Sequence, residues 1–215
     1  MIVVMVLSLI VQSMLTSRFR KYSGVPCDLT GAEVAEKMLR DHGIRDVRVC
    51  SIGGMLTDHY DPSRKVINLS QDVYSSRTVA AAAVAAHETG HAIQHAESYG
   101  PLRLRSAMVP AVNVANNLVT VVLIVGILIL ELTPALLYAG IALFGMTTLF
   151  SFITLPVEID ASSRAVQWLE ASRITSSDTT PMAADALKWA AYTYVIAALG
   201  SLATLFYYIG LARRG

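Results

Sequence analysis

Long apolar runs near both ends and in the middle of the chain separate membrane-like parts of the sequence from a water-soluble part. The runs are Ile2–Leu15, Met108–Leu130, Ala135–Leu155 and Ala184–Leu211. The two central runs are each about long enough to cross a hydrocarbon core of roughly 30 Å, and the short turn Glu131–Pro134 joins them into a helical hairpin. The first run is short for a span, and its basic residues follow it, which predicts an uncleaved anchor rather than a signal peptide. The pattern predicts about four transmembrane helices.

The region between the first two runs has the mixed pattern of a small α+β domain. Thr30 and Glu33 form a capping box, which predicts the start of an amphipathic helix. Residues Asp46–Ile52 alternate between apolar and polar, and Val66–Leu69 repeats the pattern after a predicted turn at Tyr60–Ser63. We therefore expect a short sheet ahead of the Ala-rich helix that follows.

These patterns divide the chain into five segments. They are an N-terminal transmembrane anchor at 1–22, an α+β domain at 23–106, a transmembrane hairpin at 107–156, a helix with a linker at 157–183 and a C-terminal transmembrane helix at 184–215. The basic residues Arg18, Arg20 and Lys21 after the first run place the domain on the cytoplasmic side by the positive-inside rule. The basic residues at the C-terminus, Arg213 and Arg214, then lie on the outer side of the membrane, against the statistical preference of the positive-inside rule.

Composition agrees with a membrane protein. The chain is 54% hydrophobic and 15% charged, whereas an ordinary soluble domain has about 25% charged residues. The formal net charge of +1 argues against a nucleic-acid partner, because no basic surface large enough to neutralise several phosphates is present. Cys27 and Cys50 lack metal-ligand spacing, so we interpret them as reduced thiols.

The strongest chemical signal is the sequence His-Glu-Thr-Gly-His, which begins at residue 87 inside the Ala-rich helical run Thr78–Tyr99. Residues four apart share one face of a helix, so His87 and His91 can reach a single metal ion. Glu88 lies beside them and can accept a proton from a metal-bound water, which indicates a zinc hydrolase. The alternative is an Ala-rich core helix with incidental histidines, which would leave buried polar side chains without partners.

Two functional groups remain to be assigned. A catalytic zinc usually has three protein ligands and one water. Glu158 returns to the side of His87 after the hairpin and is the predicted third ligand, with Asp160 as the competitor or as an acceptor that orients a ligand histidine. For the donor that stabilises the developing negative oxygen, His59, Tyr60 and Arg164 are candidates, and we favour His59.

Four stretches of the sequence resemble the YugP-type bacterial membrane zinc metallopeptidases. They are Leu56–Pro62, the pairs Leu69–Ser70 and Val73–Tyr74, Ala86–Gln94 and Leu155–Ser162. The resemblance covers nearly the whole chain, and the family is similar in layout to HtpX and other membrane gluzincins. It implies a zinc-dependent endopeptidase in which His87, His91 and Glu158 bind Zn²⁺. Glu88 is then the general base.

One position departs from the wider HtpX pattern. Those relatives place an Asp four residues after the ligand Glu, where it holds the first histidine. Here that position is Ser162. Either Ser162 or Asp160 must therefore orient the ligand histidines.

The sequence predicts a mainly α membrane protein with about four transmembrane helices and a small α+β zincin-like metalloprotease domain at the membrane surface. We expect it to cleave peptides or membrane proteins at the cytoplasmic face of a bacterial plasma membrane, as in membrane-protein quality control. An intramembrane protease is one alternative, although Arg77, Gln94 and His95 flank the motif too closely for a site at bilayer depth. A non-catalytic adaptor with structural zinc is the other, and such sites usually have four protein ligands.

Overall fold

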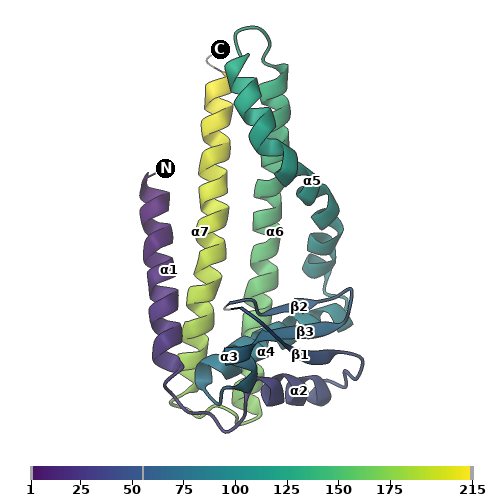
Figure 1. Ribbon diagram of the computed structural model, residues 1–215, viewed down its shortest axis with the longest axis vertical. Coiled ribbons are helices and arrows are strands. Elements are labelled where there is room, and N and C mark those ends of the chain that lie inside the picture. Colours follow the sequence, from purple (N-terminus) through teal and green to yellow (C-terminus); the bar gives the residue numbers. More distant parts are fainter. Residues whose placement is uncertain (1, 55, 214–215) are drawn as a thin grey trace.

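The protein is a bundle of long helices that stands on a small α+β domain (Figure 1). The computed structural model describes residues 2–54 and 56–213. Four of the described helices are long and apolar enough to cross a membrane. They are α1 (Ile2–Tyr22), α5 (Gly100–Leu128), α6 (Ala135–Ala171) and α7 (Thr180–Ala212). The predicted fold class, a mainly α membrane protein with a small α+β domain, is confirmed.

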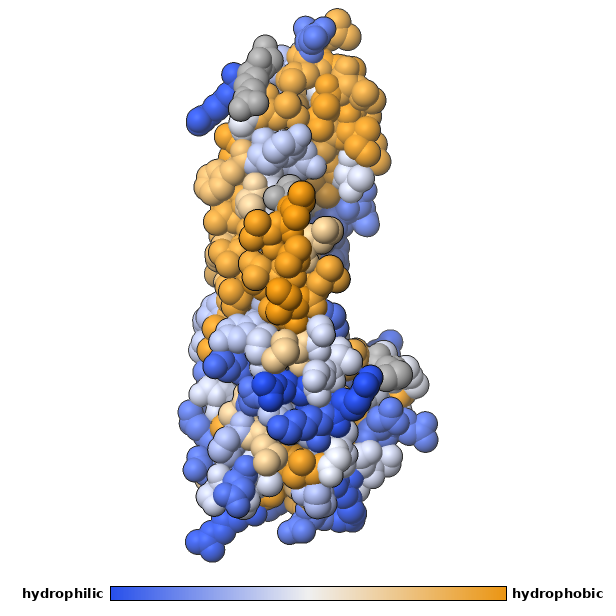
Figure 2. Space-filling view, turned by 90° about the vertical axis from the view of Figure 1, so that its left-hand side faces the viewer, coloured by the Kyte–Doolittle hydropathy of each residue, from blue (hydrophilic) through white to orange (hydrophobic). Residues whose placement is uncertain are grey.

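The surface of the molecule shows the same division. Figure 2 looks onto α1, and the upper part of this face is largely apolar, whereas the lower part, over the α+β domain, is largely polar. On α1 the exposed apolar side chains include Ile2, Val3, Leu9 and Ile10. Apolar surface on this scale, carried by helices of spanning length, indicates that lipid surrounds the bundle.

The α+β domain consists of short elements around one buried helix. They are α2 (Gly31–Asp41), β1 (Arg48–Ile52), β2 (His59–Asp61), β3 (Val66–Ser70), α3 (Gln71–Ser75) and α4 (Val79–Ala96). The strand order is β1-β3-β2, with β1 parallel and β2 antiparallel to β3. The predicted capping box is present at the start of α2, where Glu33 N–H donates to the Thr30 hydroxyl and Thr30 N–H donates to the Glu33 carboxylate.

The strand β2 was not predicted. Tyr60 and Asp61 belong to it, so the turn that we expected at Tyr60–Ser63 begins too early. The carboxylate of Asp61 accepts the backbone N–H groups of Ser63 and Arg64, which fixes the chain reversal just after the strand. A strand of three residues is too short to show an alternating pattern.

The helix α4 carries the His-Glu-Thr-Gly-His motif through the centre of the domain. Thr78 caps it, because its hydroxyl accepts the N–H of Ala81 at 3.2 Å. The alanines of α4 up to Ala92 are almost fully buried. Their small side chains let neighbouring elements approach α4 closely, so the motif sits in a rigid, packed environment.

The helix α6 brings the third predicted ligand to α4. It runs from Ala135 to Ala171 with Pro156 inside it, so the helix that we expected to begin at residue 157 is the last part of α6. A proline inside a membrane-spanning helix is tolerated where neighbouring groups satisfy the freed backbone carbonyl. Glu158 therefore sits on a continuous helix rather than at a helix start.

The predicted hairpin is formed by α5 and α6. The turn between them lies at the end of the bundle opposite the α+β domain, as does the C-terminal end of α7 (Figure 1). Both outer ends of the hairpin consequently lie on the side of the α+β domain, which is the arrangement that the positions of the apolar runs predicted.

Gly90 allows α4 and α6 to meet backbone to backbone at the motif. A Cβ atom at position 90 would lie 2.7 Å from the carbonyl oxygen of Ala161. We expect Gly90→Ala to force the two helices apart and to destabilise the fold by on the order of 1–3 kcal/mol. Zinc content should fall as well, although every ligand is retained. Thermal unfolding and metal analysis of the purified protein measure both effects.

Gly210→Ala is the matched control. Gly210 also lies in a long helix, but nothing approaches the place of its Cβ within 4 Å. Alanine is favoured over glycine in a helix, so this variant should be at least as stable as the natural protein. Equal stability and zinc content in the two variants would show that the close approach at Gly90 is unimportant.

Candidate metal centre

Two histidines of α4 and one glutamate of α6 converge in the structure. The candidate ligand atoms of His87, His91 and Glu158 all lie within 4.8 Å of one another. The Nε2 atoms of His87 and His91 are 3.3 Å and 3.5 Å from Glu158 Oε2. The structure thus brings together the three side chains that the sequence predicted as metal ligands.

The properties of these three side chains fit a cation. Oε2 of Glu158 is buried and has no hydrogen-bond partner among the described residues, an arrangement that is costly without a nearby positive charge. Burial lowers the pKa of His91, but the carboxylates of Glu158 and Glu88 outweigh that effect, so its pKa is raised. The three side chains therefore form a site that attracts positive charge. Two imidazoles and one carboxylate form a typical ligand set for catalytic zinc, which keeps an open coordination position.

Ser162 orients the first histidine. Its hydroxyl oxygen lies 3.1 Å from Nδ1 of His87, while Nε2 of His87 faces Glu158. If Nε2 held a metal, the proton of the ring would stay on Nδ1 and could be donated to the Ser162 hydroxyl oxygen. Ser162 thus takes the place of the Asp that HtpX-type relatives carry at this position.

Gln94 orients the second histidine. Its side-chain oxygen lies 3.0 Å from Nδ1 of His91, and its amide nitrogen donates to Asp160 and to the carbonyl of Val157, both at 2.8 Å. Asp160 in turn accepts a hydrogen bond from Arg164 at 2.6 Å. The sequence left Ser162 and Asp160 as alternatives, and the structure uses both, one for each histidine.

The role of Gln94 was not predicted. It was noted only as a polar residue near the motif, yet its side chain is fully buried. A fully buried amide must find partners for its oxygen and its nitrogen. Gln94 lies three residues after His91 on the same helix, so the nearest partner for its side chain is the imidazole of His91. This spacing was the signal that could have identified the role of Gln94.

We expect Gln94→Leu to weaken zinc binding by about 10–100-fold, the usual effect of removing a group that holds a ligand histidine. The variant keeps all three ligands but leaves His91 free to rotate. Competition with a chromogenic chelator measures the affinity. Gln167→Leu, on the exposed surface of α6, is the control and should bind zinc normally. Unchanged affinity in Gln94→Leu would mean that packing alone fixes His91.

Glu88 lies in the same cavity as the three ligand side chains. This cavity has a volume of about 350 Å³. Oε2 of Glu88 accepts the backbone N–H of Tyr60 at 3.1 Å, which links β2 to the motif helix. Burial raises the pKa of Tyr60 to about 12, so its phenol stays protonated at neutral pH, where it shares a 2.8 Å hydrogen bond with His95. β2 is thereby fixed against α4 at two points.

The predicted oxyanion donors occupy different places. His59 lines the cavity, and its ring nitrogens lie 2.7 Å from the carbonyl oxygen of Thr57 and 3.1 Å from the amide nitrogen of Asn68. Arg164 pairs instead with Asp160 at 2.6 Å. His59 therefore stays the predicted donor, whereas Arg164 supports the orientation of His91.

Arg105 of α5 and Tyr194 of α7 also line the cavity, although neither was predicted as a site residue. An Nη atom of Arg105 lies 3.9 Å from Oε1 of Glu158. In the sequence both residues stand in or beside apolar runs, where an arginine indicates topology and a tyrosine indicates a membrane interface. Only the packing of α5 and α7 around α4 reveals their position at the site.

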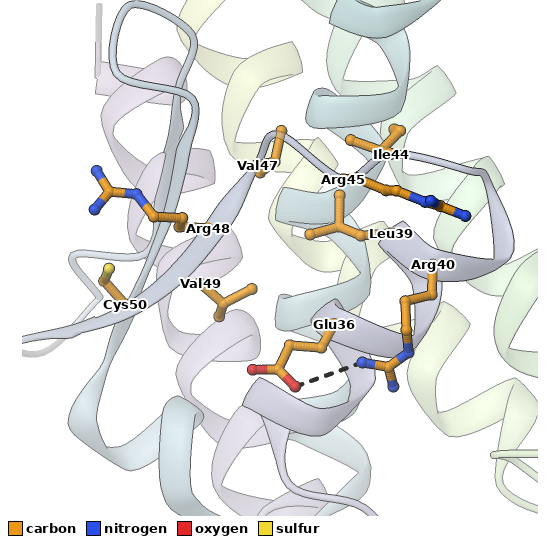
Figure 3. A pocket seen from close by; sticks show the side chains of 9 residues that line it. All are labelled: Glu36, Leu39, Arg40, Ile44, Arg45, Val47, Arg48, Val49 and Cys50. Carbon is orange, nitrogen blue, oxygen red and sulfur yellow. Dashed lines mark ion pairs between the residues drawn. The ribbon is translucent and has the colours of Figure 1, made fainter.

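A larger cavity, of about 770 Å³, lies between α2 and β1 (Figure 3). Its lining includes Arg40, Arg45, Arg48 and the free thiol Cys50, and Arg40 pairs at 3.6 Å with Glu36 one turn earlier on α2. These side chains come from α2, β1 and the segment that joins them. They offer no set of ligands for hydrolysis, so the smaller cavity at the metal group is the candidate active site.

Two histidines and a glutamate around one point, with a second glutamate beside them, are the arrangement of a zinc metallopeptidase. The chain belongs to the family described as "Putative neutral zinc metallopeptidase", whose model matches residues 1–213. It is 42% identical over 211 residues to the "Putative membrane protease YugP" of Bacillus subtilis, and the match covers 97% of this chain and 93% of that protein. No solved structure matches the chain significantly. The predicted family is confirmed, and it implies Zn²⁺ as the cofactor.

Proposed function

We propose that the protein is a zinc-dependent endopeptidase that hydrolyses peptide bonds at the membrane surface. The observation that carries the proposal is the presence of Glu88 in the same cavity as His87, His91 and Glu158. A purely structural zinc site usually has four protein ligands, and this group offers three among the residues described. An open position beside a carboxylate supports catalysis rather than a structural role.

The roles of the side chains follow from this arrangement. Zinc held by His87, His91 and Glu158 would polarise the scissile carbonyl and lower the pKa of a bound water. Glu88 takes a proton from the attacking water and delivers it to the leaving amine. The backbone N–H of Tyr60 holds Oε2 of Glu88 at 3.1 Å, so this carboxylate is oriented before the substrate arrives.

His59 is our proposed donor to the developing oxyanion. With Nδ1 engaged by Thr57, it needs a proton on Nε2 and must release Asn68 to donate. Arg105 is a second candidate, because its guanidinium already lies in the cavity. Either group would act on negative charge that develops in the transition state.

The position of the cavity supports a substrate at the membrane. Arg105 belongs to α5 and Tyr194 to α7, and both helices could cross a bilayer. The basic residues at the end of α1 favour the cytoplasmic side for the α+β domain. We therefore propose that the protein cleaves membrane proteins or their loops at the cytoplasmic face of a bacterial plasma membrane, as in quality control. The motif helix α4 is not among the four helices of spanning character, which favours this proposal over an intramembrane protease.

The test is cleavage of a reporter by the full-length protein purified in detergent. The reporter carries an unstructured segment next to a membrane tether, and metal analysis accompanies the assay. We expect one zinc per chain and cleavage within the unstructured segment. Cleavage confined to the membrane-spanning part of the reporter would favour an intramembrane protease. Stoichiometric zinc without cleavage of any reporter would favour an adaptor with structural zinc.

A further inference from the structure

Cavities on two sides of the metal group meet at it. The cavity of about 350 Å³ described above opens towards β2 and α5, and a second one, of about 170 Å³, opens towards α1 and α7. His87, Glu88 and Glu158 line both, as do Asp58 and Tyr194. A third cavity, of about 110 Å³, continues the second one along α1 and shares Leu15 and Phe19 with it. The cavities together form a groove that passes over the metal group.

The two sides of this groove differ in chemistry. The side towards α5 presents Arg105 and Ser106. The side towards α1 and α7, which we call the apolar pocket, is formed mainly by apolar side chains of α1, α4 and α7: Leu15, Phe19, Val84, Ala186, Leu187, Ala190 and Ala191. Ala186 and Ala190 lie one turn apart on α7, and their short side chains leave the space that the pocket occupies.

A polypeptide in the groove must place its scissile carbonyl near Glu88 and the metal ligands. The side chain next to that carbonyl then lies within reach of the apolar pocket, because His87, Glu88 and Glu158 are among the residues that line both cavities. A charged side chain there would lose its hydration, with few polar partners to replace it. A large apolar side chain would instead gain the free energy of burial.

We propose that the apolar pocket is the specificity pocket of the protein and binds a large apolar side chain beside the scissile bond. This inference rests on the proposed function and names its substrate class, polypeptides that carry residues such as Leu, Phe or Met at the cleavage site. Such residues are abundant where a membrane segment enters a loop, which agrees with a site bordered by α1 and α7.

The first test is a cleavage profile of the purified full-length protein on a peptide library, read by mass spectrometry. We expect a preference of at least about tenfold for Leu, Phe or Met over Ala at one position next to the cleaved bond, since a few methylenes in an apolar pocket discriminate by about 10–200-fold. Ala190→Leu should fill the pocket and reduce the preference for Phe over Ala by about tenfold or more. Zinc content should not change.

Ala197→Leu is the matched control, because Ala197 lies on the exposed surface of the same helix. It should show the natural profile. A flat profile at both positions next to the cleaved bond would overturn the inference. So would an unchanged Phe preference in both Ala190→Leu and a second pocket variant, Ala191→Leu, when both retain zinc.

The second test does not depend on turnover. A peptide with p-benzoylphenylalanine beside the expected cleavage site is photo-crosslinked to the Glu88→Gln variant, and the attachment sites are mapped by mass spectrometry. Crosslinks to Phe19 or to residues 186–191 of α7 would support the pocket, whereas Tyr194 lines both cavities and does not distinguish them. Crosslinks confined to α5 would overturn it. If the natural protein cleaves no peptide, the proposed function fails, while this crosslink still decides whether the pocket binds an apolar side chain.

Discussion

Replacing Glu158 with alanine should leave the purified protein almost without zinc. Glu158 supplies the carboxylate of the metal group, and its buried Oε2 faces both imidazoles. Loss of a group that merely orients a ligand costs about 10–100-fold in affinity, so loss of the ligand itself should exceed the upper end of that range. Metal analysis after dialysis and competition with a chelator measure the effect. Hydrolysis should disappear together with the metal.

Two variants on the same helix separate this effect from general damage. Asp160→Ala removes one of the two acceptors of the Gln94 amide nitrogen, so it should weaken zinc binding only to the extent expected for an orienting group, about 10–100-fold. Glu170→Ala removes an exposed carboxylate of α6 and should bind zinc normally. If Asp160→Ala lost the metal while Glu158→Ala retained it, Asp160 would be the third ligand, the alternative that the sequence left open.

Local sequence determines much of this fold and of its metal group. Apolar runs predicted the four long helices, although the first run is short for a span, and a capping box predicted the start of α2. His87 and His91 are four residues apart on one helix, so their proximity needs no knowledge of the rest of the structure. Glu158 lies in a distant part of the sequence, and its assignment depended on the direction in which the hairpin returns.

The features that were missed depend on tertiary contacts. β2 has three residues, and its strand conformation comes from pairing with β3. Arg105 of α5 and Tyr194 of α7 reach the site only because those helices pack together. Gln94 is spaced to reach His91 on its own helix, but its bonds to Val157 and Asp160 come from the packing of α6 against α4. Pro156 suggested a helix boundary, but the continuous α6 tolerates it inside the bundle. The hydrophobic periodicity of the sequence predicts single helices and strands. A site built from several of them can be predicted only when their packing is known.

Replacing Glu88 with glutamine should preserve zinc and reduce hydrolysis by about 10²–10⁴-fold, the usual contribution of general acid–base catalysis. Glutamine has the same shape, and its side-chain oxygen can still accept the N–H of Tyr60 that Oε2 accepts now. The amide cannot take the proton of the attacking water. Reporter cleavage and zinc content, measured on one preparation, test both parts of this expectation. Glu36→Gln, an exposed carboxylate of α2, is the control and should leave both quantities unchanged.

The Glu88→Gln and Glu158→Ala variants should therefore lose activity for different reasons that experiments can distinguish. Glu88→Gln should contain zinc and remain inactive at any zinc concentration, because its defect lies in proton transfer. Glu158→Ala should be inactive because it lacks the metal, and excess zinc should restore part of its activity, since His87, His91 and Glu88 are still present. Full activity in Glu88→Gln would assign proton transfer to another group of the cavity. The combination of bound zinc with lost hydrolysis is specific to a catalytic glutamate, because a structural zinc site has no use for a proton acceptor beside its ligands.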